Sequence, residues 1–311
     1  MQRLTLDCGV PDHLRGSILA LGNFDGFHLG HQAVVNRAIQ RAFHERRPAI
    51  VATFDPHPVK FFKPDVLPFR LSTLDQREEL FKHAGADAML VFHFDATIAG
   101  MPADRWVSEI IHDRLGVVGV ITGQDFVFGK HRSGNATSLR EQGRPLGIST
   151  RTVPAVLDQE GPISSSRIRW ALKDGDCETA TRLLTRPFAI RGPVQHGDKL
   201  GRTIGYPTAN LALGTYLRPR YGIYAVTGRL PDGRVLAGAA NLGVRPTFDP
   251  PKELLEPFFF DFSGDLYGQE IEVAFHRFLR PEAKFDSLEA LTAQMDKDCD
   301  EARRLLASAL T

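Results

Sequence analysis

The sequence predicts two successive domains: an α/β domain built on a parallel sheet, then a small antiparallel β-barrel that ends in a helix. The length of 311 residues suits two domains of about 150 residues each. In the first half, apolar runs alternate with helix-like stretches, which is typical of βαβ units and a sheet covered on both faces. From about Arg186 the runs become short, β-rich and interrupted by Gly and Pro, which favours a closed barrel. We expect the domains to span residues 1–185 and 186–311.

The elements of the first domain follow from the spacing of its apolar residues. Short continuous apolar runs indicate buried strands, and apolar residues three and four apart indicate helices. The expected strands are 17–22, 49–54, 88–93 and 117–122, and the expected helices are 28–46, 74–84 and 103–115. In a sheet of this kind, ligands bind at the carboxyl ends of the strands.

The barrel is expected to follow two short helices that end near residue 185. Its expected strands are 189–194, 221–230, 235–241, 257–262 and 269–280, with a hairpin turn at Pro231-Asp232-Gly233. A final amphipathic helix carries an apolar face of Leu288, Leu291, Met295, Cys299, Ala302 and Leu306. Asp286 and Glu289 predict a capping box at the start of this helix.

The composition excludes several classes of protein. A formal net charge of +1 provides no overall field to attract DNA or RNA. No apolar run approaches the roughly 18 residues of a membrane helix, and Asp7 and Pro11 stand where a signal peptide would be apolar. The 3 cysteines are odd in number and far apart, which argues against a disulfide scaffold. We therefore expect a cytoplasmic protein that binds neither nucleic acid nor membrane.

A glycine-rich turn with two histidines links the first predicted strand to the first predicted helix. Its residues are Gly22, Asn23, Phe24, Asp25, Gly26, Phe27, His28, Leu29, Gly30 and His31. Glycines let the backbone approach a polyphosphate, and the free N–H groups at a helix start attract the same group. His28 and His31 are three apart, so they face one way and can donate to phosphate oxygens. The alternative is a turn with two surface histidines, which the strand-to-helix context disfavours.

A second polar motif, Ser164-Ser165-Ser166-Arg167, lies further along the chain. Hydroxyl donors followed by a guanidinium suit a triphosphate, although a serine-rich helix cap is the simpler interpretation of this motif alone. With the histidine turn, it resembles the nucleotidyltransferase superfamily that carries an HxGH motif on a Rossmann-like sheet. The resemblance implies that both motifs bind ATP and that His28 and His31 stabilise the reacting phosphate.

Two further segments make the family resemblance more specific. Each lies at the carboxyl end of a predicted strand, where a ligand is expected. Phe54 ends the second strand and His57 and Pro58 follow it, whereas Asp125, Phe126 and Phe128 follow the fourth. Aromatic rings there provide flat walls for a planar ligand, although most of them are also suited to the core. Residues 16–169 together resemble the FMN adenylyltransferase module of bacterial bifunctional riboflavin kinase/FAD synthetases. The resemblance implies that these six residues bind FMN; Asn23 and Asp25 would position substrate, and Asp125 would hold either flavin or metal.

The barrel opens with a long turn rich in glycine and hydroxyl groups. It contains Gly201, Arg202, Gly205, Tyr206, Pro207, Thr208, Ala209 and Asn210. The oxygens of Thr208 and Asn210 are hard ligands of the kind that Mg²⁺ accepts beside phosphates, and Pro207 restricts the backbone just before them. The alternative is a long polar hairpin loop. The segment resembles the riboflavin kinase signature of the same family, which implies that it binds Mg²⁺ and ATP.

Further matches follow in the barrel. The resemblance implies that riboflavin is contacted by Asn241, Gly243, Arg245, Glu256 and Arg303. A carboxylate suits the role of accepting a proton from an attacking alcohol. The resemblance gives this role to Glu256, with Glu253 as the competitor. Many relatives have His two places after this Glu, and this chain has Phe258. Arg303 belongs to a terminal helix that either caps the barrel or contacts flavin.

The resemblance implies two sequential reactions that both use ATP and Mg²⁺. The barrel would phosphorylate riboflavin to FMN and release ADP, and the sheet domain would transfer AMP to FMN to give FAD and pyrophosphate. Three other interpretations are a different acceptor for the sheet domain (nicotinamide mononucleotide or phosphopantetheine), a kinase with an inactive sheet domain, and a flavin-binding regulator or store. Members of the family can associate, so the resemblance also allows an oligomer.

Overall fold

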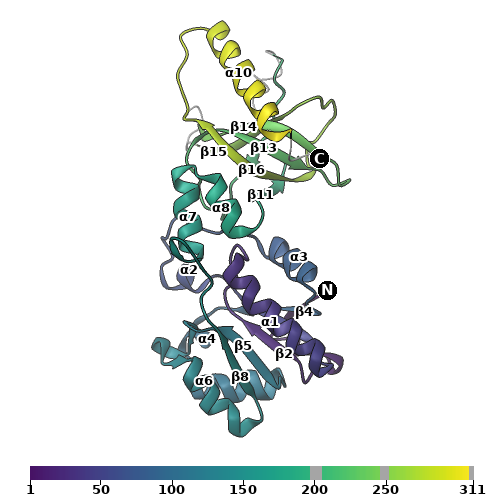
Figure 1. Cartoon of the computed structure of the whole chain (residues 1–311), viewed down its shortest axis with the longest axis vertical. Coiled ribbons are helices and arrows are strands. Elements are labelled where there is room, and N and C mark those ends of the chain that lie inside the picture. The colour runs from purple at the N-terminus through teal and green to yellow at the C-terminus, as the bar shows by residue number, and fades with distance from the viewer. Residues whose placement is uncertain (197–204, 246–251, 308–311) are drawn as a thin grey trace. The chain divides into compact units, whose positions relative to one another are not determined.

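The computed structural model describes residues 1–196, 205–245 and 252–307, and it divides into two compact units (Figure 1). The first unit contains Met1–Leu67 and Thr73–Ser164. The second contains Pro68–Ser72 and Ser165–Thr311. None of the helices within the described ranges is long and apolar enough to cross a membrane.

A parallel sheet of 6 strands forms the centre of the first unit. In the order β1-β4-β3-β2-β5-β8, its strands are β1 (Gln2–Thr5), β4 (Ala88–His93), β3 (Ala49–Asp55), β2 (Ile18–Leu21), β5 (Gly119–Gly123) and β8 (Ser149–Val153). Every neighbouring pair is parallel, which confirms the predicted sheet. The edge strands β1 and β8 were not predicted. They are more exposed to solvent than the central strands, so each carries polar residues and lacks a continuous apolar run.

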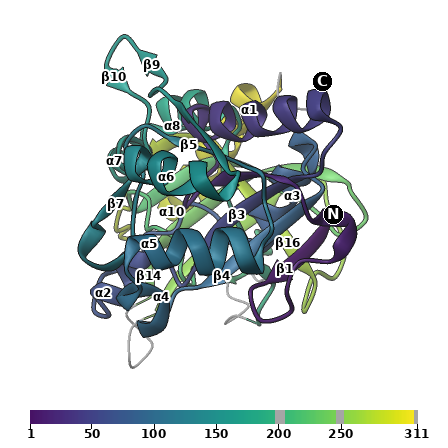
Figure 2. The ribbon, with the colours of Figure 1, turned by 90° about the horizontal axis from the view of Figure 1, so that it is seen from below.

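Helices cover both faces of this sheet (Figure 2). On one face lie α1 (Leu29–Glu45) and α3 (Leu74–Ala84), which pack on Ile18, Ala20 and Val51. On the other face lie α5 (Ala103–Arg105), the π-helical stretch η2 (Trp106–Arg114) and α6 (Ala136–Gly143). The expected helix at 103–115 is therefore present, but most of it is wound as a π-helix.

Short elements complete the first unit. They are η1 (Asp12–Leu14), α2 (Pro58–Phe62), α4 (Ala96–Gly100), η3 (Lys130–Arg132) and η4 (Arg144–Leu146), and the strand pairs β6 (Val127–Phe128) with β7 (Gly134–Asn135) and β9 (Leu157–Asp158) with β10 (Gly161–Pro162).

From Ser165 onward, the second unit forms two short helices, α7 (Ser165–Asp174) and α8 (Cys177–Leu184), and continues as an antiparallel sheet of 6 strands. In the order β11-β16-β13-β14-β15-β12, these are β11 (Phe188–Pro193), β16 (Glu270–Arg280), β13 (Gly222–Arg229), β14 (Val235–Arg245), β15 (Lys252–Phe259) and β12 (Leu211–Ala212). An antiparallel bridge between Gln195 and Asn210 brings the two edges of the sheet together. The predicted barrel is therefore confirmed. The helix α10 (Leu288–Leu306) follows it.

Two features of the barrel differ from the prediction. The strand expected at 257–262 is β15 at Lys252–Phe259, because its first half carries charged residues that a search for apolar runs discounts. The cap of α10 is Ser287, whose side chain accepts a hydrogen bond from the N–H of Ala290 at 3.1 Å, so the predicted Asp286 cap is wrong. Asp286 is one residue too early for its side chain to reach the first turn.

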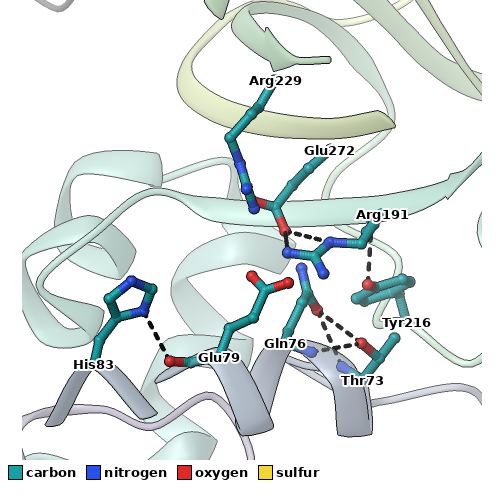
Figure 3. A network of polar contacts seen from close by, with 8 residues as sticks. All are labelled: Thr73, Gln76, Glu79, His83, Arg191, Tyr216, Arg229 and Glu272. Carbon is teal, nitrogen blue, oxygen red and sulfur yellow. Dashed lines mark hydrogen bonds and ion pairs between the residues drawn. The ribbon is translucent and has the colours of Figure 1, made fainter. Parts of the chain in front are cut away.

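A row of charged residues crosses three barrel strands (Figure 3). Glu272 of β16 lies opposite Arg191 of β11 and Arg229 of β13, and it forms ion pairs of 2.8 and 2.9 Å with them. The hydroxyl of Tyr216 accepts a hydrogen bond from the N–H of Arg191. This row ties the strands β11, β16 and β13 together on one face of the barrel.

Candidate active sites

The first candidate site lies where the strand order of the parallel sheet reverses. From the central strand β2 the chain adds β3 and β4 on one side, and then β5 and β8 on the other. Leu21 of β2 lies opposite Thr122 of β5, so the segments that follow these two strands leave the sheet side by side. Such a reversal point is the usual ligand site of an open α/β sheet. Both segments carry motifs that the sequence singles out.

The turn after β2 has an unusual backbone. Phe24, Gly26 and Phe27 have φ angles of 49°, 82° and 46°, a region that L side chains rarely adopt. A Cβ on Gly22 would lie 2.9 Å from the ring of Phe24, so only glycine fits beneath that ring. Asp25 is 1% exposed. The turn is therefore tightly packed, and because His28 is buried and His31 is half-buried, the alternative of two surface histidines is disfavoured.

His28 and His31 lie together at the start of α1. Their rings are stacked, with centroids 3.6 Å apart. His28 is the N-cap of the helix, and its Nδ1 accepts hydrogen bonds from the N–H groups of Gly30 at 3.1 Å and His31 at 3.4 Å. The expectation that these N–H groups are free to face a phosphate is therefore wrong. Because Nδ1 accepts, the proton of the neutral His28 ring is on Nε2.

The serine motif begins beside this turn. A Cβ on Gly30 would lie 3.4 Å from the carbonyl oxygen of Ile163, which immediately precedes Ser164. Ser164 ends the first unit, whereas Ser165, Ser166 and Arg167 form the first turn of α7 in the second unit.

The segments that follow β3 and β5 contain most of the residues predicted to bind FMN. His57 caps α2, since its Nδ1 accepts from the N–H of Val59 at 3.1 Å, and Pro58 occupies the first helical position. Asp125 is exposed, and one of its carboxylate oxygens lies 2.9 Å from the position of a Cβ on Gly123. The role of these residues stays a prediction.

The aromatic residues predicted to bind FMN divide between core and surface. Phe54 and Phe128 are each 7% exposed and belong to the core, where they contact Phe92 and Trp106. Phe126 is half-buried and stacks on Phe128 with centroids 5.9 Å apart. Of these rings, Phe126 has the most surface available for a ligand.

One buried residue near this site was not predicted. Arg77 of α3 is 1% exposed and donates to the carbonyl oxygen of Asn23 at 3.2 Å. An arginine within a predicted amphipathic helix carries no local signal that it turns inward, so the sequence pattern alone does not identify it.

The second candidate site is a row of three polar residues across the barrel. Glu256 of β15 lies opposite Asn241 of β14. On its other side, Leu211 lies opposite Leu255, and the N–H of Ala209 donates to the carbonyl of Pro257 at 2.9 Å. This register places Asn210 opposite Glu256, and opposed residues share a face of the sheet.

Two residues of this row are buried, and the third has a buried side-chain oxygen. Asn210 and Glu256 are 7% and 8% exposed. Asn241 has a buried Oδ1 that forms no hydrogen bond within the described part of the chain. Since buried polar atoms are normally paired, this oxygen marks a position where a ligand or water donor is expected.

The face that bears this row is the one that α10 covers (Figure 1). The next opposed pair on the same face is Ala239 and Phe258, two residues along each strand, and Ala239 packs with Ala302 and Leu306 of α10. The ring of Tyr206 meets that of Phe258 edge-on at 5.1 Å, and its hydroxyl donates to Asp296 of α10. Phe258 thus supports the segment that leads into Thr208 and Asn210.

Glu253 has a different environment from Glu256. It accepts hydrogen bonds from Arg218 at 2.9 Å and from the hydroxyl of Tyr221. The Arg218 guanidinium, assisted by Tyr221, lowers the pKa of Glu253 below its ordinary value. A carboxylate whose pKa is lowered is a weaker base, and an odd separation in a strand places Glu253 on the opposite face from Glu256.

The remaining predicted barrel residues have varied positions. Arg303 forms an ion pair of 2.6 Å with Asp261 and lies 4.3 Å from the ring centre of Phe260. Gly243 lies beneath Glu282, whose Oε1 would collide with a Cβ at this position. Arg245 ends β14, but its side chain is outside the described part. Gly201 and Arg202 lie outside the described residues, and Gly205, Tyr206, Pro207 and Thr208 lead into β12.

The oxygen atoms near Glu256 are of the kind that suits a magnesium ion. Within the described residues, no group of three His, Cys, Asp or Glu side chains could hold a metal ion. Asn210, which lies opposite Glu256, and Thr208, two residues before it, instead offer neutral oxygen ligands. Mg²⁺ is typically held by one or two protein oxygens together with substrate phosphates, so the donor set fits it.

Known proteins resemble the whole chain. Residues 10–167 match the family model described as FAD synthetase, and residues 184–306 match the one described as riboflavin kinase. A crystal structure of a protein named macrolide-efflux protein from Streptococcus pneumoniae shares the fold, with a TM-score of 0.87, 30% identity and coverage of 98% of this chain and 99% of that one.

Similar sequences agree with both family matches. Bifunctional riboflavin kinase/FMN adenylyltransferases from Pseudomonas fluorescens (40% identical, covering 96% of this chain and 95% of that one), Haemophilus influenzae (39%, 93% and 94%) and Bacillus subtilis (37%, 96% and 97%) align along the chain. Because the two family models match in succession and these relatives match throughout, the chain belongs to the family of bifunctional riboflavin kinase/FMN adenylyltransferases.

Proposed function

We propose that this chain makes FAD in two steps, with riboflavin phosphorylated in the barrel and FMN adenylylated at the parallel sheet. The observation that carries the proposal is that each fold gathers its predicted motif at one place. The histidine pair lies where the strand order reverses, and Asn210, Glu256 and Asn241 form one row on the barrel. We assign residues 1–185 to the adenylyltransferase and residues 186–311 to the kinase.

In the kinase reaction, Glu256 accepts the proton of the ribityl 5′-hydroxyl as its oxygen attacks the γ-phosphorus of ATP, and ADP leaves. Glu256 suits this role better than Glu253, whose carboxylate is engaged by Arg218 and Tyr221. Asn241 places an amide oxygen beside the base, where it can accept from a second hydroxyl of the substrate. Gly243, Arg245 and Arg303 complete the assigned riboflavin contacts.

Thr208 and Asn210 are the residues that we assign to Mg²⁺. When bound, Mg²⁺ neutralises charge on the ATP phosphates. Gly201, Arg202, Gly205, Tyr206 and Pro207 belong to the segment that we assign to ATP. The ring of Tyr206 on Phe258 anchors the end of this segment on β15.

In the adenylyltransferase reaction, a phosphate oxygen of FMN attacks the α-phosphorus of ATP, and pyrophosphate leaves. The nucleophile is already ionised, so no strong base is required. The chain must align the reactants and stabilise negative charge. His28 donates from Nε2, because its Nδ1 is occupied by the helix N–H groups. His31 stacks on it, and the assigned ATP contacts extend to Ser164, Ser165, Ser166 and Arg167.

We also propose that the chain acts in the cytoplasm. Cys8, Cys177 and Cys299 are free thiols, which suits a reducing compartment.

A time course tests the function. The purified chain is incubated with riboflavin, excess ATP and Mg²⁺, and flavins are separated by chromatography. We expect FMN to rise first and then to decline as FAD forms. A parallel reaction that starts from FMN tests the second step by itself.

Each contrary result contradicts a particular assignment. If FMN accumulates and no FAD forms, the sheet domain does not adenylylate FMN, and nicotinamide mononucleotide and phosphopantetheine are then tested as acceptors. If riboflavin is unchanged but added FMN becomes FAD, the kinase assignment fails. If flavin binds tightly without consumption of ATP, the chain is a flavin-binding protein.

A further inference from the structure

Arg77 of α3 is buried against the turn that leads to the histidine pair. Its guanidinium Nη1 donates to Thr53 Oγ1 at 2.6 Å and to the carbonyl oxygen of Asn23 at 3.2 Å. Thr53 Oγ1 in turn donates to the same carbonyl at 2.7 Å. Arg77 is 1% exposed and Thr53 is 0% exposed. Two side chains from different elements therefore converge on one carbonyl oxygen.

The fold places Arg77 at this position through the start of its helix. Thr73 and Gln76 form a capping box that fixes where α3 begins (Figure 3). Arg77 follows in the first turn, and its Nε lies 3.4 Å from the carbonyl oxygen of Thr73. A buried guanidinium is retained only where hydrogen bonds offset the loss of water.

A second contact from the same helix reaches the same turn. Phe81 lies four residues after Arg77, on the same side of α3, and is 0% exposed. Its ring meets that of Phe24 at 5.9 Å and that of Phe27 at 5.1 Å, both edge-on. Helix α3 thus holds the turn through a polar contact at Asn23 and an aromatic contact beyond it.

The turn requires such support because of its backbone. Phe24 and Phe27, at φ of 49° and 46°, are non-glycine residues in the left-handed region. Strained residues of this kind persist only where the surrounding structure holds them, and they concentrate at functional sites. Asn23 immediately precedes the first of them, and His28 immediately follows the second. The orientation of the histidine pair therefore depends on contacts made to this short stretch.

We propose that Arg77, acting with Thr53, is a positioning residue for FMN adenylylation. This inference rests on the function proposed for the sheet domain. Arg77 acts through the carbonyl of Asn23, which it holds in place. The strained turn then keeps His28 and His31 oriented toward the reacting phosphates. Small displacements of aligned groups lower the rate of a step that depends on alignment.

The test compares substitutions that remove the contact to different degrees. Thr53→Val removes the bridging hydroxyl with little change of shape, and Thr53→Ser retains it. Arg77→Met removes the donors, and Arg77→Lys keeps the charge without the forked geometry. Thr150→Val is the matched control, because Thr150 is a buried threonine of β8 whose hydroxyl donates to a different carbonyl, that of Leu139. Steady-state kinetics of FAD formation from FMN are measured well below the unfolding temperature of each variant.

We expect kcat for FAD formation to fall about tenfold to a hundredfold in Thr53→Val and Arg77→Met, with KM for FMN within about a factor of two. Thr53→Ser should restore kcat, Arg77→Lys should not, and Thr150→Val should match the wild type. Riboflavin phosphorylation in the same samples should be unchanged.

Two results would overturn the inference. Wild-type kcat in Thr53→Val and Arg77→Met, with only a lower unfolding temperature, would mean that the contact is merely structural. Equal losses of kcat in Thr150→Val would mean that any lost hydroxyl in this sheet has the same effect. A wild-type chain that forms no FAD from FMN would instead refute the proposed function, and with it the role of Arg77 in that reaction.

Discussion

At the scale of single residues, His28 has a structural role in the fold and a proposed role in the chemistry. Its Nδ1 caps α1, and its ring stacks on His31. Replacement by alanine removes the cap and the ring together, whereas asparagine is among the best helix caps and removes only the ring. The two roles can therefore be separated by experiment.

We predict that His28→Ala and His28→Asn both lose FAD formation and retain riboflavin phosphorylation. The alanine variant should also lose about 1 kcal/mol of stability through the missing cap, and the asparagine variant should recover most of it. Thermal unfolding and separate assays of the two steps measure these effects. A His28→Asn chain with wild-type FAD formation would show that the cap is all that His28 provides.

Glu256 and Glu253 allow a matched comparison on one strand. Glu256→Gln should lower riboflavin phosphorylation about 10²-fold to 10⁴-fold, the usual contribution of a general base. Glu253→Gln should mainly weaken the contacts to Arg218 and Tyr221, and so lower stability with little change in kcat. The initial rate of FMN formation decides between them. The reverse ranking would transfer the role of base to Glu253.

At the scale of elements, α10 is held to the barrel by both apolar and charged contacts. Ala302 and Leu306 pack on the sheet, and the buried Asp298 forms an ion pair of 2.7 Å with Arg280 of β16. The position of this helix depends on where it begins, and Ser287 determines that point.

Ser287→Ala should destabilise the chain by about 1 kcal/mol, because the N–H of Ala290 loses its acceptor. Asp286→Ala should change stability by less than half of that. Denaturant unfolding of both variants beside the wild type gives the comparison. A larger loss for Asp286→Ala would restore the cap that the sequence pattern predicts.

His276 of β16 should make stability depend on pH. Burial lowers the pKa of His276 below its ordinary value of 6.5, and Thr227 Oγ1 lies 2.9 Å from its Nε2. The unfolded chain therefore binds this proton more readily than the folded one. Its contribution to stability is complete above pH 6.5 and is lost as the pH falls toward the lower pKa of the folded state.

Unfolding free energies measured at several pH values test this dependence. His276→Gln should flatten the decline below pH 6.5. Thr227→Val, which removes no titrating group, should lower stability evenly and keep the slope. An unchanged slope in His276→Gln would assign the decline to other groups.

At the scale of the whole molecule, the two proposed reactions belong to different folds, each with its own candidate site. Neither proposed site requires the chemistry of the other, since FMN is a stable product of the first step. FMN made by one chain should therefore serve another.

We predict that a mixture of Glu256→Gln and His28→Asn chains converts riboflavin to FAD, although neither variant does so by itself. The His28→Asn chain supplies FMN, and the Glu256→Gln chain adenylylates it. Chromatography of the flavins over time follows the exchange. Failure of the mixture, while the Glu256→Gln chain still converts added FMN, would mean that FMN passes only within one chain.

Much of the architecture was predictable from local patterns. The strand at 88–93 and the helix at 74–84 coincide with β4 and α3, because a buried strand and an amphipathic helix leave regular apolar spacing. The edge strands β1 and β8 leave no such spacing. The first half of β15 was missed because Glu253 is charged and its partner Arg218 is distant in sequence.

The candidate sites divide in the same way. The sequence alone determined the motifs, their order and the family that they resemble, since glycine, histidine and hydroxyl groups at fixed spacing carry their chemistry wherever the chain places them. Only the tertiary structure decided that Asn210, Glu256 and Asn241 share a row, that His28 caps its own helix, and that Arg77 turns inward to Asn23. These facts depend on strand register and on packing between residues far apart in sequence, which local spacing does not encode.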